Sequence, residues 1–248
     1  MIGTKTPKIK KNKRDISDEK KAILELLNQV KRGEVQPLEA HVVWDKMNGY
    51  KEKYLTHDNI SSWNSFIGRI FEKLVYYILK TYVCGISKEA QFRNLCVFSQ
   101  SELKGNDYLF KKLSIKYGEE AVLPDTDMAI VDCNFSNQWL SEIVAIISCK
   151  TSLRERIAQA CYWKLKLVAS DTTKHVRVFL ATSDNDRDFV LKKNGEKSRD
   201  RIIAEWELDG VYILRGDFKH EWESKRVKQY EQIFNDLVQV FKGLKKGL

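Results

Sequence analysis

Apolar residues recur at every third or fourth position along the first third of the chain, a spacing that predicts amphipathic helices. The first helix is predicted over residues 15–32 and the second over 37–54. The third is predicted to begin at a cap on Asn59 or Ser61 and to run to Val83. It has the most regular apolar stripe of the chain, formed by Phe66, Ile67, Ile70, Phe71, Leu74, Val75 and Ile78.

The pattern then changes to short apolar runs rich in β-branched residues, which predicts strands. Met128–Val131 and Ile143–Ile147 are separated by a polar loop and are predicted to form a hairpin. The remaining predictions are strands over 92–98, 176–181 and 211–214, and helices over 101–112, 152–168 and 221–244. This order predicts an α/β fold in which helices flank a central mixed β-sheet, with an N-terminal helical region.

The length of 248 residues suits one large domain, or one domain with an appendage. We divide the chain into a basic arm (1–14), an N-terminal helical region (15–56) and a core that contains the sheet and the C-terminal helix (57–248). The arm carries six Lys or Arg residues. Such an arm either contacts phosphates or only keeps the chain in solution, and both interpretations stay open here.

Composition narrows the class of protein. A chain that is 43% hydrophobic and 31% charged is typical of a globular protein. No apolar run reaches the roughly 18 residues that a membrane span needs, and no apolar segment follows the basic start as in a secretory signal. The five cysteines form no CxxC pair, which favours reduced thiols and a cytoplasmic location. The net charge of +9 makes a polyanion the first partner to consider.

Candidate chemistry lies where the two strands of the predicted hairpin meet. Asp127 opens the first strand, and Lys150 ends the second after the buried run Ile143–Cys149. Strand alternation places Val144, Ile146, Ser148 and Lys150 on one face. A lone charge beside a buried run indicates a cleft at the strand end. A carboxylate beside a lysine suits Mg²⁺-assisted phosphodiester hydrolysis, and the alternative is an ordinary ion pair between strands.

These residues carry a resemblance to a known family. Pro124-Asp-Thr-Asp127 followed by Ser148-Cys-Lys150 resembles the PD-(D/E)xK nuclease core of many type II restriction endonucleases. The continuation Lys150-Thr-Ser-Leu-Arg-Glu-Arg156 is similar to a segment of the members that cut CCGG-centred sites. The resemblance covers about residues 60–182. It implies a Mg²⁺-dependent enzyme that cuts double-stranded DNA, leaves 5′-phosphates and acts as a homodimer beside a cognate methyltransferase.

One position departs from the family signature, because Ser148 stands where the second carboxylate would fall. Some members with the same departure supply the missing acid from elsewhere, and Glu72 on the third predicted helix is the best candidate here. Gly68, one turn earlier, is predicted to leave space beside it. The alternative is an exposed Glu72 that bonds Tyr76 or pairs with Arg69.

The resemblance assigns a role to each residue of the candidate site. Asp127 is the preferred metal ligand because it directly precedes an apolar strand, and Asp125 is the second choice. Glu72 and the carbonyl group of Cys149 complete the metal ligands. Lys150 positions or activates the attacking water. Ser148 takes the place of the missing acid and holds a metal-bound water.

The segment after Lys150 supplies the candidate residues for DNA recognition. Arg154 and Arg156 suit guanine, since Arg bonds its O6 and N7 atoms, and Glu155 suits the amino group of cytosine. Glu155 also fits a capping box with Ser152, which would make it a helix start. The resemblance of this segment to members that cut CCGG-centred sites implies a CCGG-containing palindrome as the target.

Three other features have two interpretations each. The segment Asp184–Asp188 is either a second acidic metal site or, preferably, a solvated turn that caps a helix. The basic loop over residues 192–201 contacts phosphates or is only solvated. Trp206 belongs to the core or to a dimer surface.

Two further functions compete with a restriction endonuclease. The first is a repair or recombination nuclease that recognises DNA structure on the same core. The second is a basic DNA-binding protein whose core is catalytically inactive, which the serine at position 148 keeps open.

Overall fold

The structure is a computed structural model that describes residues 17–89, 92, 94–153 and 156–246. The predicted basic arm over 1–14 lies outside the described residues. The helices are α1 (Asp18–Lys31), α2 (Ala40–Asn48), α3 (Lys51–Leu55), α4 (Ile60–Ile86), α5 (Gln100–Lys104), α6 (Asp107–Leu113), α7 (Arg156–Val168), α8 (Arg199–Glu207) and α9 (Gln232–Lys246). The strands are β1 (Leu95–Ser99), β2 (Ile115–Tyr117), β3 (Glu120–Val122), β4 (Met128–Asp132), β5 (Glu142–Lys150), β6 (Arg177–Thr182), β7 (Gly210–Ile213) and β8 (Val227–Gln229).

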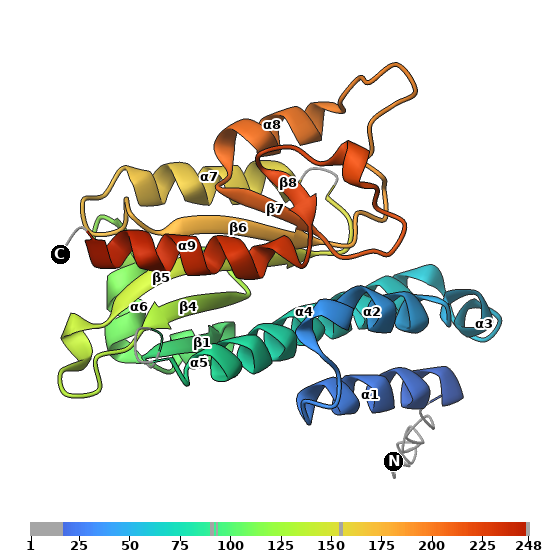
Figure 1. Cartoon of the computed structure of the whole chain (residues 1–248), viewed down its shortest axis with the longest axis horizontal. Helices are drawn as coiled ribbons and strands as arrows, with labels where there is room; N and C mark the ends of the chain where they lie inside the picture. The colour runs from blue at the N-terminus through green and yellow to red at the C-terminus, as the bar shows by residue number, and fades with distance from the viewer. Residues whose placement is uncertain (1–16, 90–91, 93, 154–155, 247–248) are drawn as a thin grey trace, which may run out of the picture.

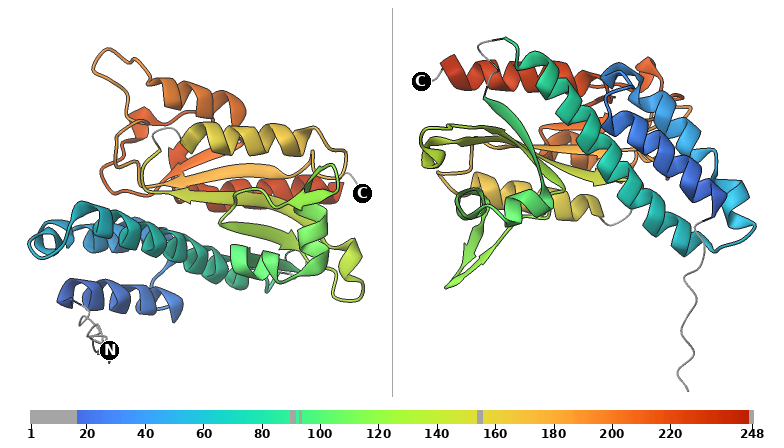
Figure 2. Two further views of the ribbon diagram at one scale, coloured as in Figure 1. Left: turned by 180° about the vertical axis from the view of Figure 1, so that it is seen from behind. Right: turned by 90° about the horizontal axis from the view of Figure 1, so that it is seen from below.

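Within the described residues, six strands form one mixed sheet in the order β1-β4-β5-β6-β7-β8. The pairs β1–β4 and β4–β5 are antiparallel, and the pairs from β5 to β8 are parallel. Helices α4 and α9 cover one face of the sheet and α7 and α8 the other (Figures 1 and 2). This is the predicted α/β fold with a central mixed sheet, and α1 and α2 pack against α4 as the N-terminal helical region.

The central helix α4 follows its sequence pattern closely. Asn59 caps it, with its side chain accepting a hydrogen bond from the Ser62 amide. The predicted stripe from Ile67 to Ile78 is buried against the sheet, and Phe66 is partly buried. The helix continues past the predicted end at Val83 to Ile86, with Gly85 inside it.

Three helices have other bounds than predicted. Two of them are interrupted at a glycine, and the start of the third pairs with a strand instead. The prediction over 37–54 splits into a 3₁₀ turn, α2 and α3, separated at Gly49. The prediction over 101–112 splits into α5 and α6 at Gly105, where Asn106 caps α6. The start of the prediction over 221–244 instead forms the edge strand β8, which pairs with β7.

Two strand predictions need correction as well. The first strand begins at Leu95, while Phe92 packs against Phe241 of α9. The hairpin β2–β3 was not predicted, because its strands of three residues each are exposed or half-buried and lack an apolar pattern.

A β-bulge corrects one prediction about side-chain direction. Val131 of β4 pairs with Ile143 of β5, but the preceding residue Ile130 pairs with Ala145. The extra residue, Val144, therefore packs in the same apolar cluster as Ala145, while Ile146 packs on the opposite face. Val144 does not share the face of Ile146, as regular alternation predicted.

Candidate active site

The antiparallel pairing of β4 and β5 brings the predicted acid and lysine together. Met128 pairs with Ile147, and the Asp127 amide donates to the Ile147 carbonyl over 3.1 Å. Lys150 Nζ lies 3.3 Å from Asp127 Oδ2 and 3.8 Å from Asp125 Oδ2. The Asp127 and Lys150 side chains are each 15% exposed and Asp125 is 34% exposed, so the cluster is half-buried at the strand ends.

Backbone contacts fix the Asp127 carboxylate in place. Its Oδ2 atom accepts a hydrogen bond from the Cys149 amide over 2.5 Å, in addition to its contact with Lys150. A carboxylate that accepts a backbone amide and a lysine is oriented without further ligands. The Asp125 carboxylate lies 3.8 Å from Lys150 and is more exposed than that of Asp127.

Two hydroxyl groups join the acidic segment to β5. Thr126 is fully buried, and its hydroxyl contacts the carbonyls of Met128 and Ile147. Ser148 is 3% exposed, and its hydroxyl donates to the Asp125 carbonyl over 3.1 Å. Sequence reasoning missed Thr126. A threonine between two acids gives no periodic signal, and its role appears only when its carbonyl partners are known.

Helix α4 brings Glu72 to the same cluster. Its half-burial and the negative charge of Asp127 raise the pKa of the Glu72 carboxyl, while Lys150 opposes this rise. Tyr76 donates to Glu102, and Arg69 donates to Ser65, so the predicted alternative partners of Glu72 are engaged elsewhere. Glu72 lies close enough to Asp127, Asp125 and Lys150 for their charges to act on its carboxyl group.

Gly68 leaves open space on α4, as predicted. A Cβ at Gly68 would meet no protein atom within 4 Å. The glycine thus leaves open space on α4, one turn before Glu72, and no packing in the structure explains it.

The donor set of the cluster suits a hard divalent cation. In the described part of the chain, no three or more His, Cys, Asp or Glu side chains converge as a preformed metal site. Two carboxylates nevertheless surround one positive charge, the Lys150 ammonium, and Glu72 adds a third whose ionised form its neighbours disfavour. A bound cation would relieve that repulsion, and carboxylate oxygens are the ligands that Mg²⁺ prefers.

The predicted DNA-recognition residues lie beyond Lys150. Arg154 and Glu155 fall outside the described residues. Arg156 is exposed, and α7 is described from this residue. Ser152 and Leu153 are not helical, so the prediction that the helix begins at Ser152 was wrong. Leu153 is buried and anchors the segment before the helix.

The two remaining loops and Trp206 also have definite places. Residues 184–188 form a turn in which 185–187 are exposed, as predicted. Asp184 itself is 1% exposed and no helix follows the turn directly, so the prediction that the turn caps a helix was wrong. Residues 192–198 of the predicted basic loop lead into α8, with Ser198 as its cap. Residues 199–201 already belong to this helix and Arg201 is buried, so the prediction of a loop that contacts phosphate or solvent was wrong at that end. Trp206 on α8 is 83% exposed, which excludes the core interpretation.

Comparisons with known proteins agree with this arrangement. A family model described as BsaWI restriction endonuclease type 2 matches residues 101–236, more than half of the chain. The putative type II restriction enzyme MjaVIP of Methanocaldococcus jannaschii is 37% identical over 190 residues, which cover 74% of this chain and 78% of that protein. The probable type II restriction enzyme HpyAORF263P of Helicobacter pylori is 35% identical over 129 residues, which cover 52% of this chain and 63% of that protein.

A solved structure shares the fold. The complex of restriction endonuclease PspGI with substrate DNA matches with a TM-score of 0.52 at 14% identity, over 94% of this chain and 96% of that one. The fold and the matches define the class: this chain is a type II restriction endonuclease, a site-specific deoxyribonuclease. Within that class it belongs to the BsaWI family. This identity sets aside the repair nuclease and the inactive DNA-binding protein.

The family implies a metal cofactor. Across residues 17–89, 92, 94–153 and 156–246, no helix has both the length and the apolar composition that crossing a membrane requires.

Proposed function

We propose that the chain hydrolyses phosphodiester bonds of double-stranded DNA at the strand-end cluster of Asp125, Asp127 and Lys150, with Mg²⁺ as the cofactor, and leaves 5′-phosphates. One observation carries this proposal: a half-buried lysine lies within 4 Å of two carboxylates at the ends of paired strands, in a chain of the BsaWI family. DNA has the phosphodiester that such a cluster can attack and the charge that a +9 chain attracts.

The contacts of each residue suggest its role. Asp127 is the main metal ligand, because its Oδ2 atom is held by the Cys149 amide and Lys150. Asp125, Glu72 and the Cys149 carbonyl complete the ligands. When bound, Mg²⁺ polarises the phosphate and lowers the pKa of the attacking water. Lys150 orients that water and stabilises negative charge on the phosphate as it is attacked.

We assign Ser148 a positioning role in place of the predicted metal-bound water. Its hydroxyl is engaged by the Asp125 carbonyl, so it holds the acidic segment against β5. It therefore acts through Asp125 and has no direct contact with the reacting atoms.

Recognition of the target uses the segment after Lys150. Arg154, Glu155 and Arg156 are the candidate base contacts, and two Arg with one Glu suit G·C pairs. We therefore propose a CCGG-containing palindrome as the target. A palindrome matches a two-fold symmetric protein, so the active form is proposed to be a homodimer. The exposed Trp206 on α8 is a candidate for contact between copies.

Two proposals concern the cell in which the enzyme acts. An enzyme that cuts a short palindrome would cut its own genome, so a cognate methyltransferase is expected to protect the same sites. Both proteins are proposed to act in the cytoplasm, where chromosomal DNA and reduced thiols occur together.

Digestion of a long DNA of known sequence tests this function. With Mg²⁺, the wild-type protein should release discrete fragments whose ends map to one palindrome. Adding EDTA should stop cleavage, and excess Mg²⁺ should restore it, since the reaction depends on the metal. Ligation of the fragments without prior treatment by a kinase would identify 5′-phosphate ends. A smear in place of discrete fragments would contradict site-specific cleavage, and a mapped site without CCGG would contradict the proposed target.

Replacing Glu72 tests its role as a metal ligand. We expect Glu72→Gln to lower the cleavage rate about 100-fold or more at low Mg²⁺, because a lost ligand removes several kcal/mol of metal stabilisation. The rate should recover partly as Mg²⁺ is raised. The measurement is the initial cleavage rate over a series of Mg²⁺ concentrations.

The stability of the same variant separates a ligand from a structural residue. The raised pKa of Glu72 means that the folded protein binds a proton at this carboxyl more tightly than the unfolded protein does. The ionised form of Glu72 at neutral pH therefore lowers the stability of the fold. Glu72→Gln should therefore unfold at the same temperature as the wild type or higher at pH 7.5. Glu25→Gln on α1 is the matched control and should leave the Mg²⁺ dependence unchanged. An unaltered Mg²⁺ dependence in Glu72→Gln would remove it from the site.

A further inference from the structure

The loop that follows β6, Ser183–Phe189, lies directly beside the proposed active site. In the parallel pairing of β5 with β6, Lys150 is opposite Thr182. The residues that follow Thr182 contact the chain just after Lys150. The Ser183 hydroxyl lies 3.2 Å from the Thr151 carbonyl, and the backbone N–H of Asn185 donates to the same carbonyl over 3.0 Å. The loop is therefore attached to the strand that carries the proposed catalytic lysine.

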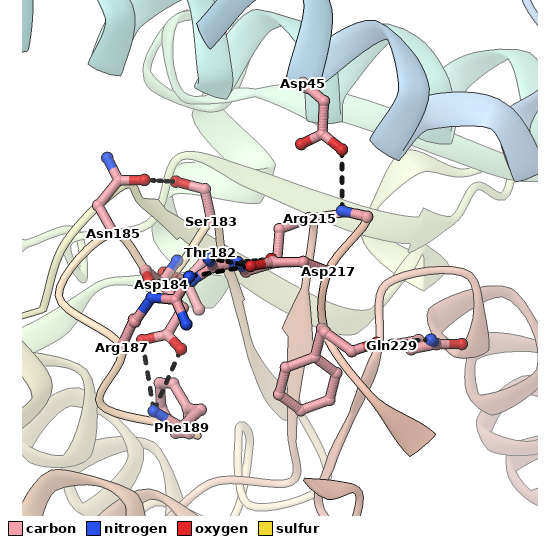
Figure 3. Close-up of polar contacts among 12 residues, drawn as sticks. Asp45, Thr182, Ser183, Asp184, Asn185, Arg187, Phe189, Arg215, Asp217 and Gln229 are labelled. Carbon is pink, nitrogen blue, oxygen red and sulfur yellow. Dashed lines mark hydrogen bonds and ion pairs between the residues drawn. The ribbon is translucent and has the colours of Figure 1, made fainter. Parts of the chain in front are cut away.

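The backbone of this loop is held in an unfavourable conformation. Asp184 and Arg187 have φ of 49° and 59°, and they are the non-glycine residues with positive φ among those described. The buried Asp184 carboxylate accepts the amides of Asp188 and Phe189, and Arg215 donates to the Asp184 carbonyl over 2.8 Å (Figure 3). Strain that surrounding contacts maintain is found most often at functional sites.

The structure holds the side chain of Asn185 with its donor group outward. Asn185 is exposed, and its Oδ1 atom lies 3.1 Å from the Ser183 hydroxyl, which shares its single hydrogen between this oxygen and the Thr151 carbonyl. Figure 3 shows the amide oxygen facing Ser183 and the amide nitrogen directed away from it. The side-chain nitrogen of Asn185 donates no hydrogen bond to another of the described residues. An amide NH₂ group has two donors, so the loop offers an immobilised, unused donor.

A polar cleft of about 350 Å³ extends from this loop to the N-terminal helices. One wall has Asn185 and the other has Lys51 at the start of α3. The acids in the cleft are already engaged: Asp45 accepts the Gly216 amide over 3.0 Å, and Asp217 accepts Arg215 and Arg187. Asp45 keeps further acceptor capacity and Asn48 also lines the cleft, so the cleft carries both donors and acceptors. Its donors, the Lys51 ammonium and the Asn185 NH₂ group, suit a ligand rich in acceptors.

We propose that the Ser183–Phe189 loop contacts DNA and that the side-chain NH₂ group of Asn185 donates a hydrogen bond to an acceptor on the DNA near the bond that is cut. This inference rests on the proposed function and adds a contact outside the segment from Lys150 to Arg156. The acceptor is either a base edge, such as guanine O6 or N7 or thymine O4, or a phosphate oxygen. Lys51 closes the same cleft from the opposite side as a phosphate contact.

The test compares full-length Asn185→Ala and Asn185→Asp with the wild type, with Asn235→Asp on the exposed face of α9 as the matched control. Affinity for a duplex with the mapped site is measured in Ca²⁺, and cleavage in Mg²⁺. A lost hydrogen bond should weaken binding by Asn185→Ala about 3- to 10-fold. Asn185→Asp should weaken it further, because a carboxylate repels the acceptors of DNA. Thermal unfolding of each variant shows whether the loop is still folded.

The pattern of loss identifies the acceptor. Selection from duplexes randomised around the mapped site should show relaxed preference at one position if Asn185 reads a base, and a uniform loss if it contacts phosphate. Both outcomes support the contact. Wild-type affinity and preference in both Asn185 variants would overturn it, while discrete wild-type cleavage that Lys150→Ala abolishes would leave the proposed nuclease function intact. Absence of wild-type cleavage would instead contradict the proposed function itself.

Discussion

Lys150→Ala should abolish site-specific cleavage while leaving DNA binding in place. The ammonium lies within 4 Å of both Asp125 and Asp127, where an attacking water and a phosphate would meet the proposed metal ligands. Loss of one positioned proton donor or charge costs about 10²- to 10⁴-fold in rate. The expected result is a fall of that size in the single-turnover cleavage rate, measured with enzyme in excess over a duplex that carries the mapped site.

The matched control for Lys150 is Lys174→Ala. Lys174 precedes β6 at the opposite end of the sheet, and it forms an exposed ion pair with Asp171. This variant removes the same charge from the chain and should cut at the wild-type rate. Binding of Lys150→Ala to DNA in Ca²⁺ distinguishes lost chemistry from lost folding. A Lys150→Ala enzyme that cuts within about threefold of the wild type would contradict the catalytic role, since its expected loss is at least about 10²-fold.

Asp209→Ala should cause the largest loss of stability. Asp209 lies just before β7, and its 7% exposed carboxylate joins three elements. It accepts hydrogen bonds from the Lys164 ammonium of α7, from the Arg177 guanidinium of β6 over 3.0 Å and from the Val178 backbone amide over 2.8 Å. Removing it leaves Lys164 and a backbone amide without their shared partner, which costs about 3–5 kcal/mol in buried ion pairs. The measurement is the free energy of unfolding from denaturant titration at pH 7.5.

The pH dependence of this loss provides a second check. Burial raises the pKa of Asp209, but the hydrogen bonds from Lys164 and the Val178 amide outweigh it, so the pKa lies below its ordinary value. A lowered pKa stabilises the fold above the unfolded value of about 4, and this stabilisation is lost as the pH falls through the folded pKa. The difference between wild type and Asp209→Ala should therefore be full at neutral pH and shrink in acid. Asp171→Ala, an exposed control, should match the wild type throughout.

Several parts of the candidate site could be predicted because they depend on neighbours along the chain. Asp127 directly precedes the first strand of one hairpin and Lys150 is the last residue of the second, so antiparallel pairing alone brings them together. Glu72 could be proposed from the apolar stripe of α4, which defines the side of the helix that faces the sheet. The burial of Asp184 shows where local patterns fail, since the Asp184 carbonyl accepts a hydrogen bond from Arg215, a distant residue.

The sequence by itself determined the class of fold and the hairpin with its acid and lysine, because helical stripes, strand runs and short connections are local properties of the chain. Only the tertiary structure decided that β8 is a strand, that Val144 turns to the other face and that Asp209 joins α7 to the sheet. The same holds for the outward amide of Asn185. The edge pairing of β8 and the ion pair of Asp209 depend on partners in other segments of the chain. The bulge and the direction of the Asn185 side chain depend on how neighbouring segments pack, which the pattern of one segment does not set.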